Sequence, residues 1–354
     1  MTTAGAPGGP RVRVPLWDNA RFAAILLVVA GHSVQKMALE ADPALVVYLF
    51  IYAFHVPLFV LVSGHFSKDR MELKDLRRLV TDLLVPYLLF ETIWTVVQWL
   101  VEGNTAVNYA NASWTLWFLL ALLMWRLLLP VLAVLRFPLV WALAAAMAAG
   151  YTEEIDNTLA LSRTFALLPF FVLGWQLRRM RAGERWQEAT LRTVVPVRIG
   201  AALLLVATAV VLAVWIPVWR EATIKYFFFA DDPYAQFGYT EWWAGLLRLA
   251  VIAFSTLLCL AVLALLPRHE TWYSPLGAAT LYVYLLHTFV LYPLRESGVL
   301  RENATIPGLL AALALAAALT LALSSPLVRR VFRPLVEPRA TFLLRSDPDR
   351  AAER

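Results

Sequence analysis

Long apolar segments recur along the whole chain, and they constrain its fold more than any other feature. Ten such segments lie at residues 18–38, 44–66, 79–101, 114–130, 137–150, 160–177, 197–218, 242–266, 272–294 and 306–328. A helix needs about 20 apolar residues to cross a bilayer, because it rises ~1.5 Å per residue through a core of ~30 Å. Soluble domains are about half apolar and a quarter charged, whereas this chain is 60% hydrophobic and 16% charged. We therefore expect an all-α fold, a polytopic membrane helix bundle of about ten transmembrane helices.

The connections between these segments predict which way the helices face. Cations gather in the connections after the second and sixth segments and beyond the last one, whereas residues 102–113 and 151–159 are acidic or neutral. Loops rich in Lys and Arg stay in the cytoplasm. The basic connections all fall on one side only if there are ten spans, with both termini cytoplasmic. The short fourth and fifth segments leave one ambiguity, because "LLPVLAVLRFPLV" (residues 128–140) could be a single broken helix.

Three regions follow from this pattern. Residues 1–15 begin with the uncharged, Gly- and Pro-rich stretch MTTAGAPGGP, so we expect a disordered tail there. Residues 16–335 form the membrane domain, and residues 336–354 a cytoplasmic C-terminal tail. The first apolar segment contains Asp18 and no small-residue cleavage site follows it, so we interpret it as a retained span. We expect a multi-pass protein of the bacterial plasma membrane, with membrane lipid around it and no nucleic-acid partner.

The first span carries two titratable groups, Arg21 and His32, which lie eleven residues apart. At 100° per residue both side chains leave the same helix face, separated by roughly 16 Å along the axis. Arg21 then lies near the cytoplasmic headgroups and His32 about two-thirds of the way across. Arg21 could be a snorkelling anchor, and His32 could be a polar residue bonded to a neighbouring helix. Ionisable groups at bilayer depth more often face a cavity and act there.

Three further ionisable groups reach a similar depth on other spans. They are His55, ~16 Å below the outer end of the second span, Glu91, ~18 Å above the inner end of the third, and His287, ~21 Å above the inner end of the ninth, all by helix rise. We expect these groups and His32 to share the middle to outer part of one bundle. Neutral histidine can act there as a general base, oriented by a carboxylate such as that of Glu91.

The Arg21–His32 spacing also suggests a ligand. Cations at the inner mouth suit a phosphorylated molecule, and its reactive end would lie ~16 Å deeper by helix rise. Coenzyme A has this shape, because its phosphates are followed by a slim arm that ends in a thioester. Other long phosphorylated donors, such as polyprenyl phosphates, would satisfy the spacing too.

The same residues resemble the integral-membrane acyltransferase family 3, and within it the branch of fucose 4-O-acetylase-like proteins. A cation, ten intervening residues and a histidine mark the first span of that family, as Arg21 and His32 do here. Further motifs in matching order are "FHVPLFVLVSGH" (residues 54–65), "PYLLF" (86–90), "WFLLALLMWRLL" (117–128), "LPFFVLGWQLR" (168–178) and "YLLHTFVLYP" (284–293). The resemblance covers nearly the whole chain. It implies transfer of an acyl group, acetyl in the first place, from cytoplasmic acyl-coenzyme A to a hydroxyl, usually on a carbohydrate.

The resemblance also assigns roles to individual residues. His32 carries over as the catalytic residue and Arg21 as the cation of the first span, and we expect Glu91 to be catalytic beside His32. Many members place cations directly before the third-span proline, whereas here Arg77 and Arg78 stand a turn earlier, before Thr81 and Asp82. We expect Arg21, Arg77 and Arg78 to bind acyl-coenzyme A, and no metal to take part. His55 and His287 would hold the acceptor, a carbohydrate or glycoconjugate, or the thioester.

Two other classes of protein remain open at this point. A transporter or flippase of a polar glycan precursor could use buried His and Glu to relay protons. It would often show inverted repeats, and we find none by inspection. A metal or haem site could be built from His32, His55 and His287, although none of the three has an i, i+4 partner. Asp231 and Asp232, in the outer loop 219–241, could contribute to acceptor binding.

Overall fold

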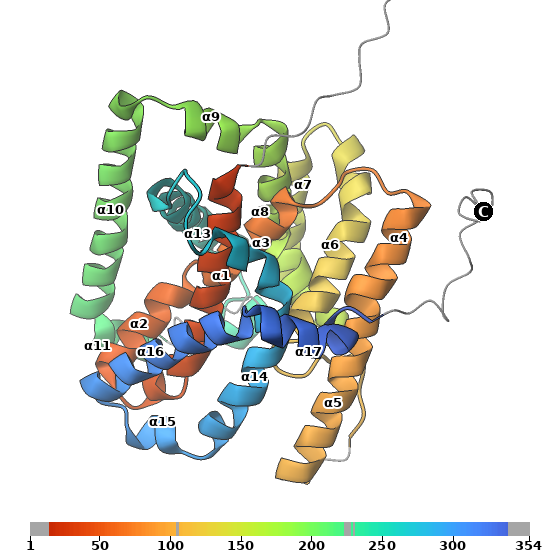
Figure 1. Cartoon of the computed structure of the whole chain (residues 1–354). Helices are drawn as coiled ribbons and strands as arrows, with labels where there is room; N and C mark the ends of the chain where they lie inside the picture. The colour runs from red at the N-terminus through yellow and green to blue at the C-terminus, as the bar shows by residue number, and fades with distance from the viewer. Residues whose placement is uncertain (1–13, 104–105, 223–227, 229–230, 339–354) are drawn as a thin grey trace, which may run out of the picture.

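The computed structural model describes residues 14–103, 106–222, 228 and 231–338. The predicted N-terminal tail and most of the predicted C-terminal tail lie outside the described residues. Within the described ranges every regular element is helical (Figure 1). The α-helices are α1 Pro15–Val34, α2 Asp42–Tyr52, α3 His55–His65, α4 Leu73–Leu79, α5 Val85–Glu102, α6 Trp117–Val134, α7 Pro138–Ala148, α8 Leu161–Arg179, α9 Ala182–Glu188, α10 Leu191–Val214, α11 Ile216–Glu221, α13 Ala244–Leu265, α14 Thr280–Glu296, α15 Val299–Glu302, α16 Ile306–Leu323 and α17 Pro326–Val336.

The predicted apolar segments all coincide with helices. In the described part of the chain, eight helical stretches are long and apolar enough to cross a membrane. The stretch Pro138–Tyr151 is apolar but shorter, and α1 is 20 residues long but carries Asp18 and Arg21. The all-α polytopic bundle is thus confirmed, and the cytoplasmic location of both termini stays a prediction. The fourth and fifth segments form two separate helices, α6 and α7, and α7 packs against α8.

The second predicted span is the one that is broken. It consists of α2 and α3, and Phe54 between them has φ −149° and ψ −11°, outside the helical region. The physical cause lies three residues later, at Pro57. A proline ring collides with the carbonyl four residues before it, here that of Ala53, and the proline lacks an N–H to donate. The break places His55 at the first turn of α3.

The third span contains a different irregularity. Residues Leu73–Glu102 form one helical stretch, in which a π-helical turn, Val80–Leu84, separates α4 from α5. Such turns insert an extra residue into the helix and are often found at functional sites. This one carries Asp82 at the inner end of the bundle.

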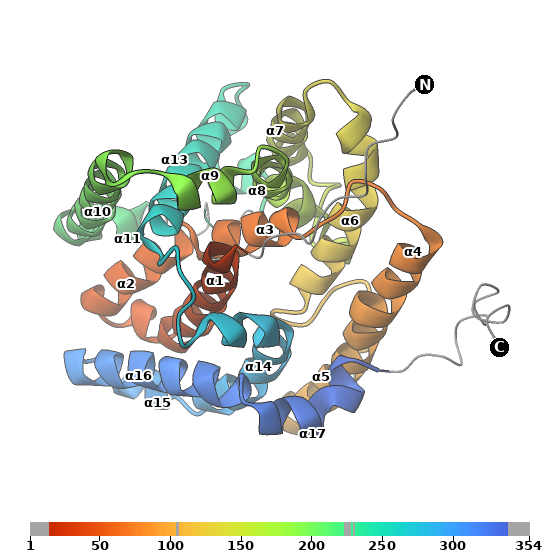
Figure 2. The ribbon, with the colours of Figure 1, turned by 45° about the horizontal axis from the view of Figure 1, so that its top comes forward.

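Helix α1 lies in the middle of the bundle, with α10 and α4–α5 at opposite edges (Figures 1 and 2). It packs against α3, α14 and α16, and α16 and α17 run across the bundle at a steep angle to α10 in Figure 1. Beside α1, α3 and α8 approach each other through two glycines. A Cβ on Gly64 would collide with the carbonyl oxygen of Phe171, and one on Gly174 with that of Leu61. Small residues permit this backbone-to-backbone packing in a bilayer.

Candidate active site

Two of the predicted histidines, His32 on α1 and His287 on α14, are in direct contact. Nδ1 of His32 lies 2.9 Å from Nε2 of His287, and the two rings are stacked with an interplanar angle of 8°. Their positions in the sequence differ by 255 residues. The packing of α1 against α14 therefore brings together two residues that the sequence could only place at similar depths.

The backbone carbonyl of Val283 determines which nitrogen of each ring carries the proton. Nδ1 of His287 lies 2.9 Å from the carbonyl oxygen of Val283, one turn earlier on α14. A carbonyl only accepts hydrogen bonds, so this nitrogen carries the proton and Nε2 of the neutral ring keeps its lone pair. His32 must then donate from Nδ1, which leaves the lone pair on its own Nε2. The pair presents one bare ring nitrogen, as a general base requires.

Exposure distinguishes the two partners. His287 is fully buried, with 0% of its surface exposed, whereas His32 is half-buried. His32 is therefore the imidazole that a substrate can reach, and His287 is the group that orients it. That His287 binds substrate stays a prediction. Its contact with His32 favours a different role, which is to orient the His32 ring.

His55 has the same internal arrangement. Its Nδ1 lies 3.0 Å from the carbonyl oxygen of Ile51, across the break between α2 and α3, so Nε2 again keeps the lone pair. That nitrogen is buried and has no hydrogen-bond partner among the described residues. That His55 binds substrate stays a prediction.

Glu91 does not make the contact that we expected. Its carboxylate was predicted to orient His32, but it accepts two hydrogen bonds from Ser113 instead, from the backbone N–H at 2.9 Å and from the hydroxyl at 2.5 Å. Nδ1 of His32 is taken by His287. The prediction used only the depth of Glu91 in the bilayer. Depth does not specify in which direction around the helix axis a side chain points. Glu91 therefore acts on residues 113–115, which we call the outer strap.

The outer strap holds an indole beside His32. The ring of Trp114 lies 5.5 Å from that of His32, and the guanidinium of Arg295 lies 4.9 Å from the indole. Trp114 has φ +39°, a left-handed conformation that costs a residue with a Cβ about 1–3 kcal/mol and persists only where neighbours impose it. Glu91 bonds the strap at Ser113, and the hydroxyl of Tyr284 donates to the carbonyl of Thr115. Strain held in this way is typical of functional sites.

An inner cavity of about 220 Å³ leads toward the histidine pair. Its polar residues include Arg21, Asp82 and Arg126, and aromatic rings line much of the rest. Tyr284 belongs to this cavity, and its ring centroid lies 6.4 Å from that of His287. Arg21, Asp82 and Arg126 thus share one cavity with Tyr284, whose ring lies near that of His287. The predicted donor-binding residues Arg77 and Arg78 lie on α4, and neither is among the described residues that line the cavity.

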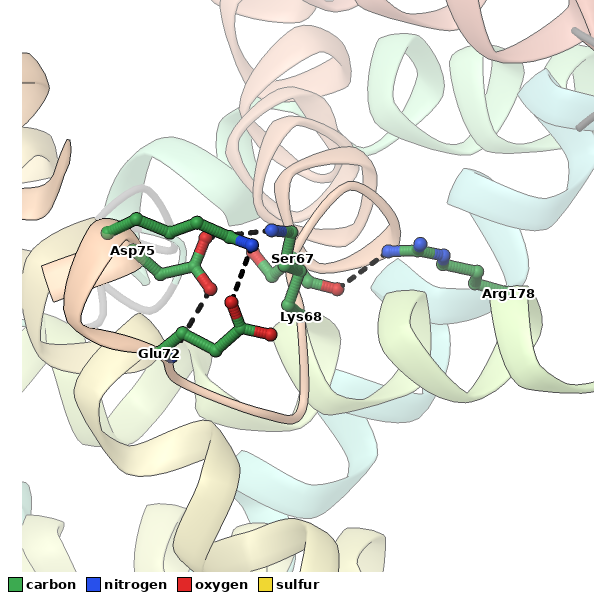
Figure 3. A network of polar contacts seen from close by, with 6 residues as sticks. Ser67, Lys68, Glu72, Asp75 and Arg178 are labelled. Carbon is green, nitrogen blue, oxygen red and sulfur yellow. Dashed lines mark hydrogen bonds and ion pairs between the residues drawn. The ribbon is translucent and has the colours of Figure 1, made fainter. Parts of the chain in front are cut away.

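A network of hydrogen bonds and ion pairs joins the turn between α3 and α4 to α4 and α8, next to this cavity's residue Phe66 (Figure 3). In the turn between α3 and α4, Lys68 pairs with Asp75 at 2.7 Å, and Arg178 of α8 donates to the carbonyl of Ser67 at 2.9 Å. Phe66, in the same turn, lines the cavity and lies under the guanidinium of Arg21, 4.5 Å from its ring centroid. The turn therefore places the ring of Phe66 against the guanidinium of Arg21.

Our sequence analysis did not single out three residues that shape this site. Arg126 was quoted only within a motif, although a charge in the middle of an apolar span is itself a signal. Asn19 is fully buried and holds α1 to the connection before α14. It donates to the carbonyls of Pro267 and His269 and accepts from the hydroxyls of Thr271 and Ser274. Trp114 lies just before the motif that begins at Trp117, and only its backbone conformation marks it.

The connection before α8 and the loop 219–241 both contribute acidic side chains to a second hollow. Glu153, Asp156, Asp231 and Asp232 line a cavity of about 460 Å³, and Asp231 pairs with Arg163 of α8. Burial, and then the charge of Asp231, raise the pKa of Asp232 above its ordinary value. Carboxylates of this kind can accept hydrogen bonds from hydroxyl groups. Within the described ranges, no group of three or more His, Cys, Asp or Glu side chains is arranged to hold a metal ion.

Two comparisons with known proteins find similarity to this chain. The sequence matches the model of acyltransferase family 3, described as an acyltransferase domain, over residues 15–327. It is also similar to the nodulation protein NolL of Mesorhizobium japonicum, with 25% identity over 185 residues. That alignment covers 48% of this chain and 49% of the relative, so it spans about half the length of each. No solved structure matches the chain.

Proposed function

This chain belongs to acyltransferase family 3, and on that premise we propose that it moves an acyl group from acyl-coenzyme A to a hydroxyl of a carbohydrate or glycoconjugate. Acetyl is the acyl group that we expect first. It is a multi-pass membrane acyltransferase, and we propose the bacterial plasma membrane as its location. The fucose 4-O-acetylase-like branch remains the relationship suggested by the sequence motifs.

The hydrogen-bonded pair of His32 and His287 carries this proposal. Nε2 of His32 takes the proton from the acceptor hydroxyl as that oxygen attacks the thioester carbonyl carbon. The carbon–sulfur bond breaks, and the imidazolium of His32 returns the proton to the departing sulfur. The products are an ester and free coenzyme A, so atoms and charge balance. His287 holds Nδ1–H of His32 through both steps, which keeps the reacting nitrogen aimed at the acceptor.

The inner cavity supports a donor that enters from the cytoplasmic side. Arg21 stands at its polar end, and His32 lies ~16 Å farther along α1 by helix rise. A donor with an anionic head and a slim neutral arm fits this order, because apolar and aromatic side chains line the walls between the charges and Tyr284. Arg77 and Arg78 would meet the nucleotide end outside the cavity, on α4.

The outer side supports a polyhydroxylated acceptor. The half-buried indole of Trp114 offers an apolar face next to His32, and sugar rings present apolar C–H faces that stack on indoles. The carboxylates of the outer hollow can accept hydrogen bonds from further hydroxyls. A glycan could therefore extend from the strap toward the outer loop.

Release of free thiol by the purified protein tests the proposal. Acetyl-, propionyl- and succinyl-coenzyme A are offered with a panel of sugars to the wild type, His32→Ala and His269→Ala. His269 lies in the connection before α14 and is the matched control histidine. General-base catalysis is worth about 10²–10⁴-fold, so His32→Ala should lose that much sugar-dependent release while His269→Ala keeps it. Undiminished transfer by folded His32→Ala would contradict the proposal. Transport of a glycan without thiol release would favour the transporter.

A further inference from the structure

Arg126 is a charged residue in the middle of an apolar helix that the proposed mechanism does not use. It is the tenth residue of α6, which has 18 residues, and the helix carries no acidic residue. A charged side chain at this depth is costly unless it faces a cavity or a partner. Arg126 faces the inner cavity, together with Arg21 and Asp82.

The guanidinium of Arg126 is only partly satisfied. Its Nε is buried and has no hydrogen-bond partner in the part of the chain that the structure describes. The carboxylate of Asp82 and the guanidinium of Arg21 line the same cavity. Two guanidinium groups and one carboxylate therefore share the cavity, and they leave a net charge of +1 facing its interior.

The two arginines stand at nearly the same level. Arg21 is six residues from the start of α1, or ~9 Å by helix rise, and Arg126 is eight residues from the end of α6, or ~12 Å. Both ends belong to the predicted cytoplasmic side. Arg21 and Arg126 thus face one cavity from two helices, each about 16 Å or less on the inner side of His32 by helix rise.

We propose that Arg126 and Arg21 together bind the diphosphate group of the acyl donor. Guanidinium groups present planar forks of donors that match phosphate oxygens, and they stay charged when buried. The unpartnered Nε of Arg126 supplies a donor that such a group can use. Asp82, on the π-helical turn at the mouth, is the counter-charge that the diphosphate displaces. This inference rests on the proposed function, because it assigns the donor's diphosphate to one place in the same cavity.

Binding measurements on the full chain in detergent test the assignment without using catalysis. The ligands are coenzyme A, which carries a diphosphate and a 3′-phosphate, dephospho-coenzyme A, which keeps only the diphosphate, 4′-phosphopantetheine with a single phosphate, and pantetheine with none. Hydrogen bonds to charged groups contribute about 1.5–3 kcal/mol, so Arg126→Gln should weaken coenzyme A binding by roughly 10- to 100-fold. Pantetheine should bind wild type and variant alike. Asp82→Asn should tighten coenzyme A binding, because it removes the competing anion.

Two control variants and one competition assay accompany these measurements. Arg136→Gln removes an exposed arginine just beyond the end of α6 and should leave coenzyme A binding unchanged. Arg126→Lys keeps the charge without the fork, so it should fold at least as well as Arg126→Gln and bind coenzyme A with intermediate affinity. Inorganic pyrophosphate should compete with coenzyme A in the wild type and lose this ability in Arg126→Gln.

The outcomes separate the inference from the proposed function. If Arg126→Gln binds coenzyme A as tightly as the wild type, or loses pantetheine equally, the assignment of the diphosphate is wrong while His32-dependent transfer can stand. If the wild type binds farnesyl diphosphate but no coenzyme A, the site serves a lipid-linked donor, and the assignment to acyl-coenzyme A is overturned. If the wild type neither binds coenzyme A nor releases its thiol, the proposed function fails and the inference fails with it.

Discussion

The inner and outer halves of the site solve different physical problems. The inner half contains charged side chains, those of Arg21, Asp82 and Arg126, which line one cavity. The outer half contains imidazoles whose protons are assigned by uncharged backbone carbonyls, those of Val283 and Ile51. On the proposed function, the difference teaches that charged groups bind the donor, whereas neutral groups perform the transfer at a depth where a lasting charge is costly.

The largest effect should come from breaking the outer arrangement at His287. In His287→Leu, Nδ1–H of His32 loses its acceptor, so the ring is free to turn or to protonate on the wrong nitrogen. Loss of the correct tautomer costs about 10⁴-fold in a serine protease triad, which sets the scale, and we expect at least a 10²-fold fall in kcat. His287→Gln retains an acceptor and should recover part of the rate. Equal kcat in His287→Leu and the wild type would contradict the orienting role.

A large effect on stability should follow from separating α3 and α8, the helices beside both halves. Gly64→Ala places a Cβ against the carbonyl oxygen of Phe171, and overpacking of this kind costs about 1–3 kcal/mol or more. Gly200→Ala, on α10, meets nothing within 4 Å and is the matched control. Thermal unfolding in detergent should show a clear fall in Tm for Gly64→Ala and no fall for Gly200→Ala. Similar values for both would argue against the close helix contact.

An intermediate effect should follow from releasing the outer strap. Glu91→Ala removes both bonds to Ser113, so Trp114 loses the support that keeps its backbone strained, and we expect about a 10-fold rise in KM for the acceptor. If Glu91 acts through Trp114, the double variant Glu91→Ala, Trp114→Ala should be no worse than Trp114→Ala alone, since coupled sites are not additive. If the losses of the two single variants multiply in the double variant, Glu91 acts on the substrate independently of Trp114.

The smallest effect concerns the pH dependence of the outer hollow. Burial and Asp231 raise the pKa of Asp232 above its ordinary value of 3.8, so the folded state binds this proton more tightly than the unfolded state. Stability from this group is then present at low pH and declines as the pH rises through the folded-state pKa. Asp232→Asn should flatten this decline in a series of Tm measurements. If the slope of Tm against pH is the same in Asp232→Asn and the wild type, the Asp232 carboxyl group is solvated in the folded state.

The sequence was informative about depth and much less so about rotation. Apolar length located the helices of all ten predicted segments but not the short α9 and α15, and the eleven-residue spacing placed Arg21 and His32 on one face of α1. From depth alone, His55, Glu91 and His287 were all candidate partners of His32. The packing of α1 against α14 brings His287 into contact with it. The carboxylate of Glu91, expected beside His32, contacts Ser113 for the same reason, and its catalytic role stays a prediction. The break before His55 had a local cause in Pro57 and could have been predicted from the motif "FHVPLF".

Histidine-selective ¹⁵N labelling with NMR of the detergent-solubilised protein tests the central claim most directly. Ring nitrogen shifts distinguish protonated from bare nitrogens, and the spectra of His32→Ala and His287→Leu identify the two signals among the five histidines of the chain. We predict that both rings are neutral at pH 7 with the proton on Nδ1, which leaves Nε2 of His32 bare. A His32 ring that carries its proton on Nε2, or that exchanges freely between tautomers, would contradict the account.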